Sequence, residues 1–165
     1  MDAGAASDRT EGTLNGGDGS MDILVVGGDA SLADTTSGEA VRASNFEGLA
    51  VRPGTAATVS LTAAATGSIL VAGSVTGDTL VGGAAKDTFV ITKGVGAVTI
   101  TGFGTTAGPT ADVLVLKGFD ASAKLTRGTT TSTQLLLDGN VIATVGDEAA
   151  AAITSAPSTF VVRQP

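Results

Sequence analysis

The residues best suited to chemistry in this sequence are aspartates that follow glycine turns. Two nine-residue units lie back to back at residues 73–81 and 82–90. Each has a leading Gly, an Asp in sixth place, a Thr after it and a closing Val. Carboxylates and the carbonyls of Gly turns are oxygen ligands, which Ca²⁺ prefers. We therefore expect a calcium site made by Gly73, Asp78, Gly82, Gly83 and Asp87. The alternative is that these Asp side chains accept hydrogen bonds from their own turns.

A second group of glycines and aspartates lies nearer the N-terminus. Residues 12–29 repeat the order of a Gly/Asp turn followed by a short apolar strand, although Met21 adds one residue to the spacing. The same ligand chemistry predicts a further calcium-binding group here. Its candidate ligands are Gly17, Asp18, Asp22 and Asp29. Asp112 is a separate candidate ligand, with a turn or capping role as its alternative.

Composition excludes several classes of function. The chain has no His and no Cys, so Ser-His-Asp and Cys-His catalysis, thiolate or imidazole zinc sites and disulfides are all excluded. The net charge of −7 opposes nucleic-acid binding, which needs clustered basic residues. Twelve of the sixteen acidic residues are Asp, the residue of turns and calcium loops. We expect a protein that is not an enzyme.

The elements that must hold these aspartates are short strands. Small and β-branched residues dominate, and Gly-rich breaks recur at intervals typical of an all-β sandwich, barrel or β-solenoid. An Asp-Gly pair at 138–139 predicts a hairpin within 133–145. Asp147 is expected to begin one short helix, which Pro157 ends before a closing strand at 158–162. Single helical turns are expected at 37–41 and 120–124. The remaining strands are expected at 23–26, 45–51, 55–61, 68–72, 79–81, 88–92, 97–101 and 113–116.

We expect a tail and one domain. Residues 1–12 are small and polar and read as a flexible tail, followed by a single β domain at 13–162. Within the domain, 13–72 is an N-terminal β part, 73–120 carries the nonapeptides, and 121–162 is a C-terminal capping part. No apolar run approaches the length of about 18 residues that a membrane span requires. The N-terminus also lacks the pattern of a signal peptide, so export would use another route.

The segment Gly82-Gly-Ala-Ala-Lys-Asp87-Thr-Phe89 resembles the RTX (hemolysin-type) calcium-binding nonapeptide, Gly-Gly-x-Gly-x-Asp-x-apolar-x. The preceding Asp78-Thr-Leu-Val also fits that family. Residues 73–162 carry most of the resemblance, with a weaker likeness at 12–29. Ala85 and Lys86 depart from the pattern, and an Ala in a left-handed turn position would be strained. Residues 45–51 resemble the connecting region of bacterial surface-layer proteins and large adhesins.

The resemblance implies an all-β fold, either a parallel β-roll or β-solenoid or a solenoid-like sandwich, with short Gly/Asp turns, a C-terminal hairpin and one short helix. It implies a secreted, non-catalytic protein of the bacterial cell surface or matrix that binds Ca²⁺, leaves the cell by type I secretion and folds outside. Low charge and open β edges favour self-assembly into a surface layer, sheath or filament, with a cell-surface polysaccharide as a candidate partner. Alternatives are a calcium-binding secretion and folding module of a type I exported hydrolase or toxin, and an adhesin-like binding module.

Overall fold

A computed structural model of the chain describes residues 14–15, 22–31, 43–44, 46–60 and 67–165. The expected tail at 1–12, the helical turn at 37–41 and the candidate ligands Gly17 and Asp18 lie outside the described residues.

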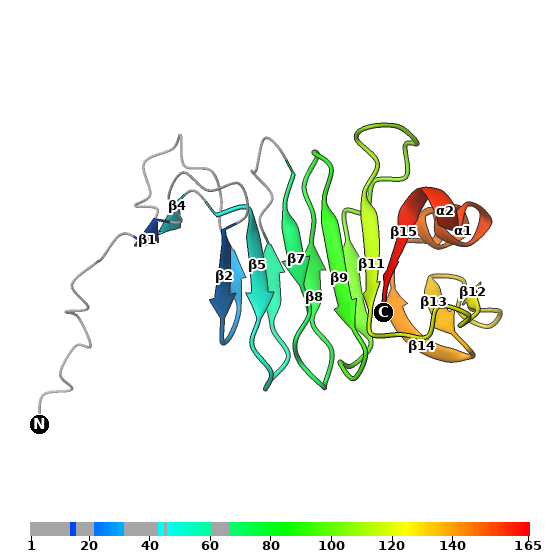
Figure 1. Cartoon of the computed structure of the whole chain (residues 1–165), viewed down its shortest axis with the longest axis horizontal. Helices are drawn as coiled ribbons and strands as arrows, with labels where there is room; N and C mark the ends of the chain where they lie inside the picture. Colours follow the sequence, from blue (N-terminus) through cyan, green and yellow to red (C-terminus); the bar gives the residue numbers. More distant parts are fainter. Residues whose placement is uncertain (1–13, 16–21, 32–42, 45, 61–66) are drawn as a thin grey trace, which may run out of the picture.

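The described chain consists mostly of β-strands in two sheets, with two short helices near the C-terminus (Figure 1), which confirms the all-β prediction. The six-stranded sheet has the order β15-β11-β9-β7-β5-β2 and the seven-stranded sheet the order β12-β13-β14-β10-β8-β6-β3. The strands of the first are β2 (Ile23–Val26), β5 (Gly48–Val51), β7 (Ile69–Val71), β9 (Thr88–Thr92), β11 (Val113–Lys117) and β15 (Val161–Gln164). Those of the second are β3 (Ala30–Ser31), β6 (Thr58–Ser60), β8 (Thr79–Val81), β10 (Val98–Thr101), β12 (Leu125–Arg127), β13 (Gln134–Leu137) and β14 (Asn140–Thr144). A separate pair joins β1 (Leu14–Asn15) to β4 (Ala43–Ser44).

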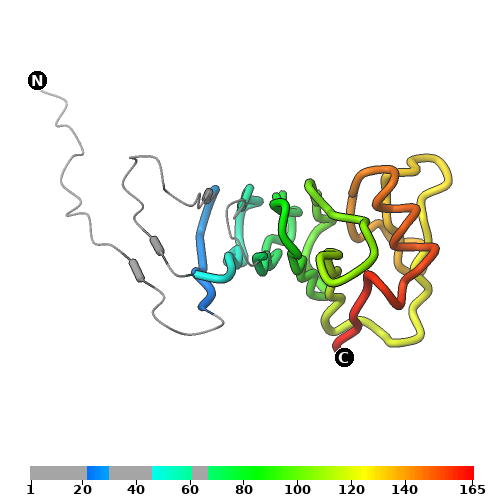
Figure 2. The backbone as a smooth tube through the Cα atoms, turned by 90° about the horizontal axis from the view of Figure 1, so that it is seen from above, coloured from blue at the N-terminus to red at the C-terminus, as the bar shows by residue number. Residues whose placement is uncertain are grey.

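From β5 to β11 the chain changes sheet with every strand. Each strand pairs in parallel with the next strand but one, as in the pairs β5–β7, β7–β9 and β9–β11 of one sheet and β6–β8 and β8–β10 of the other. Figure 2 shows these successive passes side by side along the long axis. Residues about twenty apart in sequence therefore come to equivalent places, one pass above the next.

The core lies between the two sheets. Leu49, Leu70, Phe89 and Leu114 are in register across the six-stranded sheet and are fully buried. Val59, Leu80 and Ile100 face them from the seven-stranded sheet, again in register and buried. Each such side chain contributes about 1.5–3 kcal/mol by leaving water. Successive side chains of a strand point to opposite faces of its sheet, and this row occupies the inward-facing positions.

The C-terminal part covers one end of this stack (Figure 1). The predicted hairpin is confirmed: β13 and β14 pair antiparallel around Asp138 and Gly139, which have φ angles of 49° and 81°. Two positive φ angles are typical of the type I′ turn, which Asp-Gly favours. The sequence analysis did not predict β12, which pairs with β13.

Three local predictions are wrong. Helix α1 (Asp147–Ser155) forms as expected, but Pro157 begins a second helix, α2 (Pro157–Phe160), so the closing strand starts only at Val161. Proline suits the first helical position because its missing N–H has no partner there anyway. No helical turn forms at 120–124, because the Asp120 carboxylate accepts hydrogen bonds from the backbone N–H and hydroxyl of Ser122 and makes a local turn.

No described helix is long and apolar enough to cross a membrane.

Candidate cation site and the aspartate turns

Asp78 is buried in the turn that leads into β8, and its carboxylate accepts three backbone hydrogen bonds. The N–H groups of Gly73 and Ser74, in its own turn, donate to Oδ2 at 2.8 and 2.9 Å. The N–H of Ala57, on the preceding pass of the chain, donates to Oδ1 at 2.9 Å. Asp78 therefore closes its own turn and also joins it to the neighbouring one.

Asp87 has the same role at the start of β9. Gly83 N–H donates to Oδ2 at 2.6 Å, while the N–H and hydroxyl of Ser68 donate to Oδ1 at 2.8 and 2.7 Å. Ser68 precedes β7, so this bond again joins one pass to the next. Both Asp87 and Ser68 are almost completely buried.

Asp112 continues the row in front of β11. Its Oδ1 accepts the N–H of Asp87 at 2.7 Å and its Oδ2 that of Gly104 at 2.6 Å. Burial raises the pKa of the Asp112 carboxyl and the nearby charge of Asp87 adds to the rise, while the two backbone hydrogen bonds oppose it. The structure thus brings two of the predicted ligands, Asp87 and Asp112, side by side inside the protein.

The strand register shows that these residues form a row, which we call the turn ladder. It consists of the residues just before β2, β5, β7, β9 and β11, five strands of the six-stranded sheet: Asp22, Glu47, Ser68, Asp87 and Asp112. At three of the four steps the backbone N–H of one residue donates to the side chain of the next. These bonds run from Asp22 to Glu47 Oε2 at 2.7 Å, from Ser68 to Asp87 Oδ1 at 2.8 Å and from Asp87 to Asp112 Oδ1 at 2.7 Å. Glu47 and Ser68 were not predicted as members of this row, because the expected strands at 45–51 and 68–72 included both residues, whereas the observed strands begin one residue after them, at Gly48 and Ile69.

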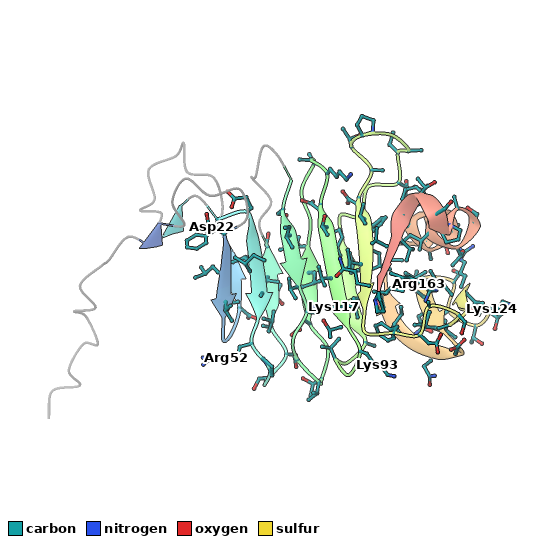
Figure 3. All side chains as sticks on the ribbon, viewed as in Figure 1. Asp22, Arg52, Lys93, Lys117, Lys124 and Arg163 are labelled. Carbon is teal, nitrogen blue, oxygen red and sulfur yellow. The ribbon has the colours of Figure 1, made fainter. Side chains whose placement is uncertain are left out.

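Asp22, at the N-terminal end of the ladder, has a carboxylate oxygen that no described residue satisfies. Its carbonyl accepts the N–H groups of Glu47 and Gly48 at 2.9 and 3.2 Å. Its Oδ2 is shielded from solvent and has no hydrogen-bond partner among the described residues. Figure 3 shows Asp22 near the start of β2, whereas Arg52 lies near the opposite edge of the stack. A shielded carboxylate oxygen without a donor is unfavourable unless a proton or a cation compensates it.

Asp29 stands apart from this group. It is exposed in the turn before β3, and its Oδ1 accepts the N–H of Thr58 at 2.7 Å. It therefore joins neighbouring passes in the other sheet, as Asp78 does. Within the described part of the chain, no three acidic side chains gather closely enough to hold an ion between them.

The predicted turn glycines allow close approach of backbone segments. A Cβ on Gly73 would lie 1.8 Å from the carbonyl oxygen of Val51, and one on Gly82 would lie 2.7 Å from Asp87 Oδ2. A side chain on Gly73 would therefore displace the backbone of the neighbouring pass, whereas one on Gly82 would displace the Asp87 and Phe89 side chains of its own turn and strand. Ala85 has a negative φ angle, so the strain expected there is absent.

An ion pair that the sequence analysis also missed fixes the start of α1. Arg127 pairs with Asp147, and the Ser132 hydroxyl donates to the same carboxylate oxygen. The bond from Ser132, followed by that from Arg127, lowers the pKa of Asp147. This group is exposed and lies far from the turn ladder in sequence.

Comparisons with protein-family models, with curated proteins and with solved structures found no match to this chain.

Proposed function

We propose that this chain is a secreted, calcium-binding structural protein of the bacterial cell surface or matrix, and that it adopts a parallel β-roll. Support for the β-roll comes from the parallel pairing of every second strand between β5 and β11 and from the turn ladder along one edge. Short turns that carry Asp at the strand entrance repeat along the stack. This arrangement repeats carboxylates, which are oxygen ligands of the kind that Ca²⁺ prefers, along one edge of the stack.

The observation that carries the calcium proposal is the unsatisfied Oδ2 of Asp22. Asp22 lies next to Glu47 in the turn ladder, and Glu47 Oε2 accepts the Asp22 backbone N–H at 2.7 Å, so a second carboxylate reaches this residue. Ca²⁺ takes six to eight oxygen ligands, and the preceding Gly17 and Asp18 supply further oxygens nearby in sequence. We therefore assign the strongest cation site to Asp22, with Glu47 and Asp18 as its other carboxylate ligands.

The buried aspartates further along the ladder are weaker candidates. A carboxylate offers about four lone-pair positions. Asp78 and Asp87 each use three of these for hydrogen bonds, whereas Asp112 uses two. Asp112 therefore has most capacity left, and a bound cation would offset the burial that raises its pKa.

Calcium would couple folding to location. Where Ca²⁺ is scarce, stacked carboxylates such as Asp22 and Glu47 repel one another and weaken the N-terminal end of the sheet. Where Ca²⁺ is abundant, binding to the folded state alone adds stability that grows with the logarithm of its concentration. A chain exported in a loose state by type I secretion would then fold outside the cell.

The outer face of the six-stranded sheet supports the self-assembly part of the proposal. Val25, Val162 and Ile23 are 62%, 46% and 37% exposed. Val25 and Val162 lie at the two ends of one in-register row that also contains Ala50, the half-buried Val71 and Val90, and the buried Val115. An aliphatic row on an outer face favours association with another surface, here a second copy of the chain. Light scattering in Ca²⁺ should show assemblies that grow with protein concentration, whereas a monodisperse monomer would reject this part.

Calorimetry and far-UV circular dichroism with and without millimolar Ca²⁺ test the calcium proposal. We expect heat of binding, and a rise in β signal when Ca²⁺ is added. The variant Asp22→Asn should weaken binding, whereas Asp120→Asn, which changes an exposed carboxylate with local hydrogen bonds, should leave it unchanged. Identical spectra together with an absence of binding heat would overturn the proposal.

A further inference from the structure

A groove lies where the seven-stranded sheet meets the start of α1. Its volume is about 460 Å³, within the range of about 300–1,000 Å³ typical of small-molecule sites. The end of β10, the loop that follows it, the end of β14 and the first turn of α1 form its walls. The side chains that matter here are Thr99, Thr101, Thr105, Thr144, Phe103 and Glu148.

The chemistry of this groove suits a ligand rich in hydroxyl groups. Each of the four threonine hydroxyls both donates and accepts hydrogen bonds, and the exposed Glu148 carboxylate accepts them. The lining contains no Lys or Arg, so an anionic ligand would meet Glu148 without compensation. The groove therefore favours a neutral ligand that donates at least as many hydrogen bonds as it accepts.

The same groove also offers a fixed apolar strip. The Phe103 ring lies between Phe89 and Phe160, with centroid distances of 5.6 and 6.2 Å. Ile100, Val145 and Ala149, all buried, form the rest of the apolar part of the lining. A sugar ring has hydroxyls at its rim and C–H groups on its faces, which matches hydroxyls beside a held aromatic side chain.

A row of threonines leads out of the groove across the sheet. Thr58, Thr79, Thr99 and Thr144 are in register on β6, β8, β10 and β14. All four are exposed or half-buried, and neighbouring strands place them about 4.8 Å apart. A ligand that begins in the groove can therefore continue across the strands and meet a hydroxyl at each one.

We propose that the groove and the threonine row bind a neutral polysaccharide chain that runs across the strands of the seven-stranded sheet. This goes beyond the proposed function and gives the cell-surface polysaccharide, a candidate partner from the sequence, a place and a chemical class. It uses none of the candidate calcium ligands, so it stands or fails separately from the calcium site.

The test is titration of the isotope-labelled full-length protein with the disaccharide and hexasaccharide of β-1,4-linked glucose and of β-1,4-linked N-acetylglucosamine, followed by NMR. We expect shifts at Thr99, Thr101 and Thr144, and tighter binding of a hexasaccharide than of its disaccharide, because the longer chain reaches Thr79 and Thr58. Thr99→Val keeps the side-chain shape and removes the hydroxyl. Loss of one such hydrogen bond should weaken binding about three- to tenfold.

The matched control is Thr88→Val, which makes the same change on the outer face of the opposite sheet and should leave affinity unchanged. The proposal is overturned if neither sugar series shifts the groove residues, if Thr99→Val and Thr88→Val weaken binding equally, or if only an anionic saccharide such as oligogalacturonate binds. Repeating the titration in excess chelator separates the two proposals. Groove binding that persists while calcium binding fails would leave this inference intact.

Discussion

Replacement of Asp78 by Ala tests whether the turn aspartates hold neighbouring passes of the chain together. The change removes the acceptor of three backbone N–H groups, those of Gly73, Ser74 and Ala57. A hydrogen bond to a charged group contributes about 1.5–3 kcal/mol, so three give an upper limit of about 4.5–9 kcal/mol. Burying the Asp78 charge is itself costly and water can reach the partly buried Gly73 N–H, so we expect a net loss of about 3–5 kcal/mol.

The assay is urea unfolding followed by far-UV circular dichroism, since the chain has no Trp or Tyr. The control is Asp120→Ala, which removes two hydrogen bonds to Ser122 on the surface and should cost less than about 1.5 kcal/mol. Both variants should be measured at low and at saturating Ca²⁺. If Asp78 acts through its hydrogen bonds, its loss is the same at both concentrations; a loss that grows with Ca²⁺ marks it as a ligand. Equal losses in the two variants would refute the reasoning.

Two further predictions concern the ladder and its turns. The pKa of Asp112 is raised above 3.8, so the folded state binds this proton at a higher pH than the unfolded chain does, and the contribution of Asp112 to stability should increase as pH falls from the raised pKa towards 3.8. The variant Asp112→Asn should lack this increase. NMR titration of the Asp112 carboxyl carbon should give a midpoint above 3.8, and a midpoint at or below 3.8 would contradict the prediction. Gly77→Ala should destabilise the protein more than Gly94→Ala in the same urea assay. Both positions have positive φ, which costs an Ala about 1–2 kcal/mol, but a Cβ on Gly77 would lie 2.2 Å from the carbonyl oxygen of Ala97 whereas Gly94 has no atom within 4 Å. Equal losses in the two glycine variants would show that the close approach between passes is not rigid.

Much of the strand arrangement follows from local sequence. Short apolar segments between Gly-rich breaks predicted β8 and β9 with their observed bounds, and the Asp-Gly pair predicted the hairpin at Asp138. These features depend on residues close together in the chain. Helix α2 was missed because the β-branched residues after Ser158 suggested a strand, whereas Pro157 favours the first position of a helix.

The bonds that Asp78 and Asp87 accept within their own turns match the alternative expected from the sequence, whereas the bonds that the buried aspartates make between passes could not be predicted from it. The residues that donate to Asp78, Asp87 and Asp112 from the neighbouring pass are 21, 19 and 25 positions away. Such separations become contacts only once the length of each pass is fixed, and the sequence leaves that length open. The groove beside α1 depends in the same way on β10 and β14, which meet more than forty positions apart.

A structure determined with bound Ca²⁺ gives the most direct test of the central claim. We predict an ion coordinated by Asp22 Oδ2 at about 2.3–2.6 Å, with Glu47 and oxygens from the segment around Asp18 completing its shell. A structure grown in millimolar Ca²⁺ in which Asp22 Oδ2 bonds only to protein donors or water, with no ion nearby, would contradict the account.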